Sequence, residues 1–426
     1  MRQRKFKAPP RKTLRRWRVP PALTHGDTDA FEGLSVLEEV PGELGLVLWQ
    51  SLRDAMLWGR ADLAQRGALF APASDTARMA ATLAAGAPAE TEEPLKVLAG
   101  MVGQPETARE ENVALACRQL SQWAEARGLL AAALSFAQAA AVVTPADSSC
   151  AYNVGRLAKL RTEYNRAETW YRRTIALARQ AGDWPTYALA FLGLGNVYVQ
   201  RGNYPAAERF FERALRAAGR NSLHEIEGRA RHDLFGIAVE RDNVARAHEM
   251  ARGAFESYGP HHPSVPALVK DIAYFWTTQG YGDRALPVLK QLLPQVTEPT
   301  LRLALIGDLG RAAGFVGDRA EFQGAWGEAT EMVTASPGLF TAAAAWLDLS
   351  HGALSLGAWE RAEDAAQRAL DGAAKLGLAR VRFAAEAVMD AARRRQHAEA
   401  QAAPGRDQWR ETTDSLADEL IHSLAG

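Results

Sequence analysis

The sequence repeats itself at intervals of 37–40 residues, and this periodicity restricts the fold more than any other feature. Residues 154–174 and 194–214 carry the same pattern of small and aromatic side chains, shifted by 40 positions. Later copies are marked by Gly280, Gly317 and Gly357, and a weaker copy precedes Pro145. Units of this length stack on their neighbours, because a single unit cannot bury its apolar face. We therefore expect a linear array over most of the 426 residues.

Each repeat is predicted to form two helices. Apolar residues recur at spacings of three and four, which is the period of one helix face. Gly202, Gly280, Gly317 or Gly357 follows the first segment, where glycine ends a helix without a β-carbon clash. Small residues on the second segment let paired helices approach closely, and aromatic residues fill the space beside them. The small residues are Ala167, Ala207, Ala247, Ala285 and Ala362, and the aromatic ones are Tyr171, Phe211 and Trp326.

The best copy runs Leu-Gly-Asn-Val-Tyr over residues 194–198, then Gly-Asn-Tyr over 202–204, then Ala207, Phe211 and Ala214. This pattern resembles the tetratricopeptide repeat. It departs from the family in its period, since the usual unit has about 34 residues, and in Phe322, which stands where alanine is expected. The longer period, and the loop over residues 258–266, are similar to kinesin light chain; the period also resembles that of some bacterial signalling regulators.

The resemblance implies an all-α fold, a right-handed superhelical solenoid of antiparallel helix pairs. HEAT or armadillo repeats share a period of about 40 residues and are the alternative, but they do not explain the Leu-Gly and Gly-x-Tyr positions. We expect four segments: a basic disordered arm (1–25), an N-terminal helical cap (26–106), about seven repeats (107–375) and C-terminal helices that cap the solenoid (376–426).

Outside the repeats, helices are predicted over residues 41–58, 75–85, 94–102, 379–401 and 406–424. The last one carries Trp409, Leu416, Leu420 and Leu424 on one stripe. Because solenoid ends need sealing, we expect it to cover the final repeat. A free helix that binds a partner is the alternative.

The formal charge is zero, from 50 basic and 50 acidic residues, but the charges are unevenly distributed. Residues 1–20 contain basic residues and no acid, which leaves an acidic remainder. Such an arm could bind nucleic-acid phosphates or an anionic surface; it could also be a solubility tail or fold back on the acidic body. The basic residues of the arm are Arg2, Arg4, Lys5, Lys7, Arg11, Lys12, Arg15, Arg16 and Arg18.

The sequence offers no catalytic constellation. Gly-Lys does not occur, which excludes a Walker phosphate-binding loop, and no nucleophile, base and acid come together in a known motif. Two cysteines, Cys117 and Cys150, are too few for a four-thiolate zinc site and are expected to be buried apolar residues. We predict neither enzyme activity nor a cofactor. With no apolar run of about 18 residues and no secretory signal, the expected location is cytoplasmic.

In families of this kind the first helices line a concave groove. Carrying the family's groove positions onto this chain identifies Arg156, Lys159, Asn196, Gln200, Arg229, His232, Glu240, Lys270, Tyr274 and Arg311. Basic and amide residues outnumber acids in this set, so we expect an acidic or C-terminal carboxylate segment to bind there. The carboxylate clamp of chaperone-tail receptors is not reproduced, because Tyr152 and Gly193 replace the lysine and asparagine that it requires.

The resulting prediction is a non-catalytic scaffold or regulatory adaptor that binds a protein or peptide in the groove. The alternative is a nucleic-acid-associated regulator that works through the basic arm. Fold alone does not decide between them.

Overall fold

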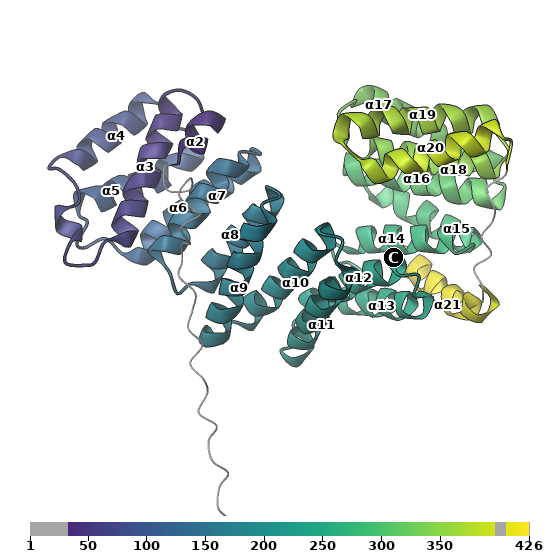
Figure 1. Ribbon diagram of the computed structural model, residues 1–426, viewed down its shortest axis with the longest axis horizontal. Coiled ribbons are helices and arrows are strands. Elements are labelled where there is room, and N and C mark those ends of the chain that lie inside the picture. The colour runs from purple at the N-terminus through teal and green to yellow at the C-terminus, as the bar shows by residue number, and fades with distance from the viewer. Residues whose placement is uncertain (1–32, 397–405, 426) are drawn as a thin grey trace, which may run out of the picture. The chain divides into compact units, whose positions relative to one another are not determined.

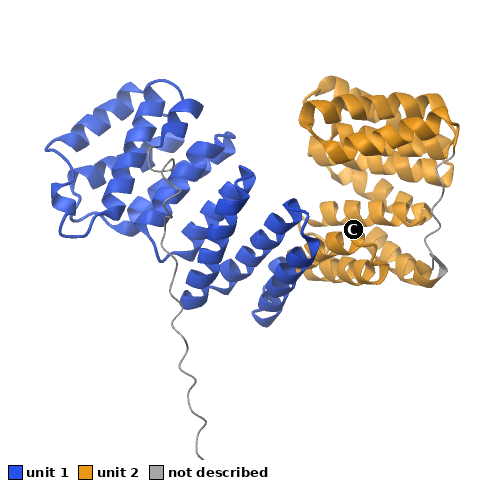
Figure 2. Ribbon diagram, viewed as in Figure 1, with its two compact units in different colours: residues 1–226 blue, residues 227–426 orange. Residues whose placement is uncertain are grey.

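The computed structural model describes residues 33–396 and 406–425. They form 20 α-helices and two short 3-10 helices, and no strand is present in these ranges (Figure 1). The chain divides into two compact units, Met1–Ile226 and Glu227–Gly426 (Figure 2). The predicted all-α fold of paired helices is confirmed. The basic arm and its nine cations lie outside the described residues.

The first unit is built from short consecutive helices. Its elements are α2 (Leu34–Glu39), α3 (Glu43–Arg60), η1 (Arg66–Ala68), α4 (Ser74–Ala84), α5 (Ala89–Gly103), α6 (Glu110–Ala126), α7 (Leu130–Val143), α8 (Ser148–Leu160), α9 (Tyr164–Ala181), α10 (Trp184–Gln200) and α11 (Tyr204–Arg220). The helices predicted over 41–58 and 75–85 are confirmed as α3 and α4. The one predicted over 94–102 starts five residues earlier, with Pro94 inside α5.

Helix α7 is the centre of the N-terminal part of this unit. Every residue from Ala131 to Val143 is buried, as expected for a helix that is apolar on all sides. It packs against α6, α8 and α3. The carboxylate of Glu39 on α2 accepts hydrogen bonds from the backbone N–H groups of Ala131 (2.9 Å) and Ala132 (2.8 Å). The short helix α2, which the sequence analysis missed, thus satisfies free donors at the start of the core helix.

The repeat motif has a direct steric explanation in α10. A β-carbon on Gly193 would lie 2.3 Å from the Tyr171 ring, and one on Gly195 would lie 2.3 Å from the Phe211 ring. The glycines therefore leave room for the aromatic residues of the second helices. The predicted alanines at 167, 207, 247, 285 and 362 are all fully buried.

The second unit continues the alternation of first and second helices. Its elements are α12 (His224–Glu240), which begins just before the unit boundary, α13 (Val244–Tyr258), α14 (Val265–Thr278), α15 (Gly282–Leu292), η2 (Leu293–Gln295), α16 (Pro299–Val316), α17 (Arg319–Ala335), α18 (Ala342–Ser355), α19 (Trp359–Leu376), α20 (Ala379–Arg393) and α21 (Arg406–Ala425). The predicted turn glycines 280, 317 and 357 have positive φ angles of 86°, 83° and 70°. Phe322, the exception to the motif, is buried beside Trp326.

The C-terminal helix α21 docks within the second unit, but not where it was expected. It packs against α13 and α15, the second helices of two earlier pairs, instead of covering the final repeat (Figure 1). Leu416 and Leu420 of its apolar stripe are fully buried. Trp409 stacks on His248 of α13, with the two ring centroids 5.5 Å apart.

Ion pairs at the edges fix the register of α21. Arg284 of α15 lies 2.6 Å from Asp414, and Arg410 lies 3.1 Å from Asp283 of α15. The prediction failed because α13 and α15 do not contact one another extensively, which leaves their faces for a helix from elsewhere in the chain. The assignment of 26–106 as a cap stays a prediction, whereas the capping role expected for 376–426 is wrong for its last helix, α21.

Candidate functional site

The predicted groove residues are divided between the two units. Arg156, Lys159, Asn196 and Gln200 lie on α8 and α10 of the first unit. Arg229, His232, Glu240, Lys270, Tyr274 and Arg311 lie on α12, α14 and α16 of the second unit. Each set is therefore a separate candidate surface.

In the first unit the predicted residues do not form one site. Arg156 of α8 makes a bidentate ion pair with Glu125 of α6, with 2.6 Å between Nη2 and Oε2. The hydrogen bonds from Arg156 hold the pKa of Glu125 below its usual range. Asn196 donates to the carbonyl of Leu192 in its own helix, and Gln200 is exposed. The structure thus brings Arg156 together with an acid that the sequence analysis had not placed there.

In the second unit a polar network runs across four successive first helices, α12, α14, α16 and α18. His232 Nε2 lies 2.9 Å from Asp271 Oδ2, and Lys270 Nζ lies 2.8 Å from Asp271 Oδ1. Lys270 Nζ also lies 3.8 Å from Asp308 Oδ2. Arg311 Nη1 lies 2.9 Å from Asp348 Oδ1, and the Arg311 guanidinium lies 5.0 Å from the centre of the Tyr274 ring. We call His232, Lys270, Asp271, Tyr274, Asp308, Arg311 and Asp348 the first-helix cluster.

The exposed fraction of the side chains differs across the first-helix cluster. The Asp271 side chain is 42% exposed and Tyr274 is 36% exposed, whereas the Asp308 side chain is only 4% exposed. Asp308 Oδ2 receives no hydrogen bond from any described residue. Its burial therefore has no compensating donor, which is unusual for a carboxylate.

Burial and charge change the protonation of the cluster. Burial raises the pKa of Asp308 to about 8, although Lys270 acts in the opposite direction. Burial also raises the pKa of Asp348 against the effect of Arg311. For Asp271, burial is outweighed by the hydrogen bond from His232 and the charge of Lys270, so its pKa is lowered. Strongly shifted groups gathered on one surface are a common property of functional sites.

These contacts correct the charge expected at the groove. Basic and amide residues were expected to outnumber acids in the groove, but His232, Lys270 and Arg311 each face a carboxylate from the next first helix. Glu240 pairs with Arg380 at the surface, and Arg229 is exposed. The basic excess that favoured an acidic ligand is therefore absent from the first-helix cluster.

The sequence analysis missed Asp271, Asp308 and Asp348. A signal was present, because aspartate recurs at 233, 271, 308 and 348 with the period of the repeat. In the last three copies the residue three positions later is Tyr274, Arg311 or His351, which lies on the same helix face. A search restricted to the family's groove positions does not include this aspartate.

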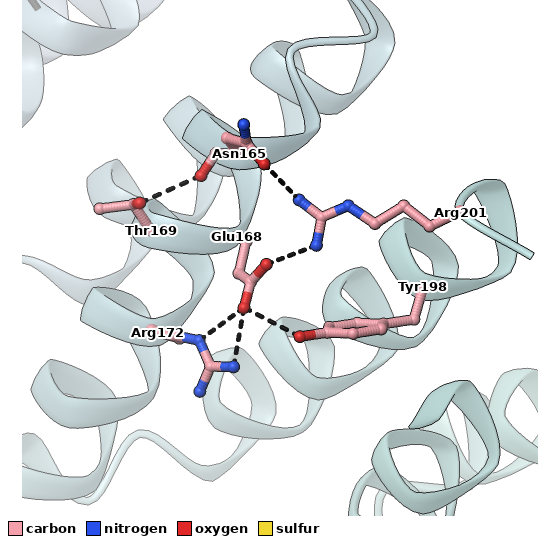
Figure 3. Close-up of polar contacts among 6 residues, drawn as sticks. All are labelled: Asn165, Glu168, Thr169, Arg172, Tyr198 and Arg201. Carbon is pink, nitrogen blue, oxygen red and sulfur yellow. Dashed lines mark hydrogen bonds and ion pairs between the residues drawn. The ribbon is translucent and has the colours of Figure 1, made fainter. Parts of the chain in front are cut away.

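A second polar cluster lies in the first unit, between α9 and α10 (Figure 3). Glu168 accepts hydrogen bonds from Arg172 (2.7 Å), from the Tyr198 hydroxyl (3.0 Å) and from Arg201 (2.6 Å), and Arg201 also donates to Asn165 (2.7 Å). Burial acts to raise the pKa of Glu168, but these hydrogen bonds outweigh it and lower the pKa. The cluster joins the second helix of one pair to the first helix of the next, so the motif residue Tyr198 has a structural role.

Other kinds of site are not found among the described residues. Within residues 33–396 and 406–425, no group of three His, Cys, Asp or Glu side chains could hold a metal ion. Cys117 and Cys150 are buried, as predicted, and burial raises the pKa of their thiols to about 12 and about 11. None of the described helices is both long enough and apolar enough to cross a bilayer.

Comparison with known proteins supports the repeat interpretation. The family model described as Tetratricopeptide repeat matches residues 147–220, which comprise α8–α11. No sequence among the curated proteins matches the chain.

Solved structures provide an independent comparison of the fold. The Signal Transduction ATPase with Numerous Domains protein with a tetratricopeptide repeat sensor, from Pyrococcus horikoshii, is 12% identical, with a TM-score of 0.50 over 92% of this chain and 62% of that one. BtubC (BKLC) from P. vanneervenii is 18% identical (TM-score 0.42, 54% of this chain and 92% of that one). The TPR2AB domain of yeast Sti1, in complex with pHSP90, is 12% identical (TM-score 0.26, 66% and 99%). The Pyrococcus horikoshii structure, with its TM-score of 0.50, supports the fold.

Proposed function

Because this chain is a tetratricopeptide repeat protein, we propose that it acts without catalysis, as a module that binds a peptide or protein segment along its first helices. Stacked repeats build extended surfaces suited to such segments. We propose the first-helix cluster of the second unit as the binding site. A cytoplasmic location and a role as scaffold or regulatory adaptor are part of this proposal.

The observation that carries the proposal is the series of ionisable side chains on successive first helices. His232, Lys270 and Arg311 each meet a carboxylate on the next helix, so that the ionisable groups form one continuous strip. Buried ion pairs contribute little net stability, since the cost of desolvation offsets their attraction. Such a strip is therefore poorly explained by stability alone. Exposed Asp271 and Tyr274 make it accessible from solvent.

Site-specific photo-crosslinking tests the proposal. A photoreactive phenylalanine analogue is placed at Tyr274 in the full chain, and at Phe340 as a control. Phe340 is a 65% exposed aromatic residue of the same unit, outside the first-helix cluster. We expect the analogue at position 274 to capture defined partner segments in cells that the analogue at position 340 does not.

A second experiment separates binding from folding. Tyr274→Ala should abolish capture of the partner identified by crosslinking while the protein stays folded. Because the residue is 36% exposed and the Arg311 guanidinium lies 5.0 Å from its ring centre, a small decrease in melting temperature is expected. Phe340→Ala should retain capture. Identical crosslinking profiles at the two positions, or undiminished capture by Tyr274→Ala, would refute the assignment of the site.

The basic arm remains the alternative surface for a partner. Its residues lie outside the described part of the chain, so nucleic-acid binding stays a prediction from the sequence. Deleting residues 1–20 and measuring salt-sensitive binding to duplex DNA and to single-stranded RNA tests it.

A further inference from the structure

We propose that the first-helix cluster receives a basic group, the side chain of a lysine or arginine in the bound segment, and that Asp308 is its acceptor. This inference rests on the proposed peptide-binding function and specifies the chemistry of the ligand. It reverses the acidic ligand expected from the sequence.

The first argument is the balance of charge inside the cluster. Lys270 and Arg311 supply two fixed cations, whereas Asp271, Asp308 and Asp348 supply three carboxylates. Lys270 is within hydrogen-bond distance of Asp271, and Arg311 is within hydrogen-bond distance of Asp348. The third carboxylate, Asp308, has only the Lys270 ammonium, which lies 3.8 Å away and is shared with Asp271.

The second argument is the environment of that carboxylate. Asp308 is 4% exposed, and its Oδ2 atom has no donor among the described residues. The distance of 3.8 Å to Lys270 Nζ is too long for a hydrogen bond. A buried carboxylate whose cation is shared and too distant for a hydrogen bond is stabilised by taking up a proton or a further cation, because a buried charge without hydrogen bonds is costly.

In the free protein a proton takes this role. The charged groups acting on Asp308 are Lys270 and Asp271 from α14, Asp348 from α18, and Arg311 from its own helix. Burial, together with the charges of Asp348 and Asp271, outweighs Lys270 and Arg311 and raises the pKa of Asp308 to about 8, so the carboxyl group is mainly protonated at neutral pH. A basic ligand group would replace this proton. Asp308 loses H⁺ to the solvent, and its carboxylate pairs with the ligand ammonium or guanidinium.

The accessible edge of the cluster suits a long basic side chain. Asp271 adds a second carboxylate near the solvent, where its side chain is 42% exposed. The Arg311 guanidinium already lies 5.0 Å from the centre of the Tyr274 ring, but Tyr274 is 36% exposed, and its exposed part offers apolar surface to the aliphatic part of lysine or arginine. An acidic side chain would instead meet cations that are already paired and a carboxylate that repels it.

Peptide pools of defined charge test the inference with the full-length protein. The pools contain short peptides of equal length, with random positions shared by all pools and the remaining positions fixed as lysine, glutamine or glutamate. Binding is measured by calorimetry at neutral pH in two buffers that differ in ionisation enthalpy. We expect the lysine pool to bind at least about tenfold more tightly than the glutamine pool, and to release protons on binding.

Asp308→Asn is the diagnostic variant, because it keeps the shape of the side chain and removes its ability to carry charge. It should bind the lysine and glutamine pools equally and should release no proton. The control Asp390→Asn changes a 58% exposed aspartate of the same unit and should behave like the wild type.

The outcomes distinguish this inference from the function on which it rests. If the glutamine or glutamate pool binds as tightly as the lysine pool, the basic ligand is refuted while peptide binding stands. If Asp308→Asn keeps the lysine preference, or if wild-type binding releases no proton, Asp308 is not the acceptor. If no pool binds, the proposed peptide-binding function fails together with the inference.

Discussion

The docking of α21 leads to a quantitative prediction: Leu416→Ala should loosen this helix strongly, whereas Asp414→Ala should not. Leu416 is fully buried against the rest of the second unit. Asp414 lies 2.6 Å from Arg284, but the two side chains are 34% and 37% exposed. The two substitutions therefore separate apolar packing from ion pairing on a single helix.

The magnitudes differ clearly. Truncating a buried leucine to alanine costs about 2–5 kcal/mol, since transfer free energy and a cavity both count. An ion pair that is one-third exposed contributes about 0–1 kcal/mol, because water screens it. Most of the stability of a helix in a protein comes from the packing of its apolar face, so α21 depends on docking. A loss of about 2 kcal/mol should increase the population of undocked α21 by about thirtyfold.

Hydrogen exchange of the full chain, read by mass spectrometry over α21, measures this population directly. Leu416→Ala should accelerate exchange in α21 by at least about thirtyfold, and Asp414→Ala should accelerate it by less than about fivefold. His422→Ala, on the exposed side of the same helix, is the matched control. Equal effects of Leu416→Ala and Asp414→Ala would show that apolar packing does not hold the helix.

Further predictions concern the core, the cluster between the repeats, and pH. Gly195→Ala should destabilise the first unit by about 1–3 kcal/mol, because its β-carbon would lie 2.3 Å from Phe211. The control Gly324→Ala should not destabilise the protein, because no atom lies within 4 Å of a β-carbon at this position. Equal melting temperatures of the two variants would contradict this prediction. Tyr198→Phe removes one hydrogen bond to Glu168 and should cost about 1 kcal/mol in urea unfolding; no change would mean that the bond contributes nothing. Asp308 has a folded pKa of about 8, above its unfolded value of about 3.9, so the native state binds the proton more tightly. Wild-type stability should therefore fall as pH rises from about 5 to 8, and parallel unfolding profiles for the wild type and Asp308→Asn would refute this.

The repeats could be predicted from the sequence because their determinants are local. The positive φ at Gly317 and the contact of Gly195 with Phe211 both lie within one repeat or between neighbours. Their spacing therefore appears directly as a period in the sequence. The position of α21 could not be found in this way. Its apolar stripe indicated docking, but its site depends on α13 and α15, more than 100 residues earlier in the chain.

The short helix α2 escaped prediction for a related reason. It has six residues, and its role depends on Glu39, which caps α7 at Ala131, a partner 92 residues away. No periodic pattern marks such a segment, because a single carboxylate carries the contact. Isolated interactions of this kind are determined by tertiary packing and leave little trace in local sequence.

The charge of the candidate site could not be predicted from single helices. Lys270 and Arg311 were correctly placed on first helices, but their charge was read as if each helix stood alone. In the stack, Lys270 faces Asp308 and Arg311 faces Asp348, because a period of 37–40 residues brings equivalent helix faces side by side. The charge of such a surface is thus a property of neighbouring repeats. Because Lys270 is shared between Asp271 and Asp308, the pairs leave one carboxylate in excess, and this excess is the basis for proposing a basic ligand.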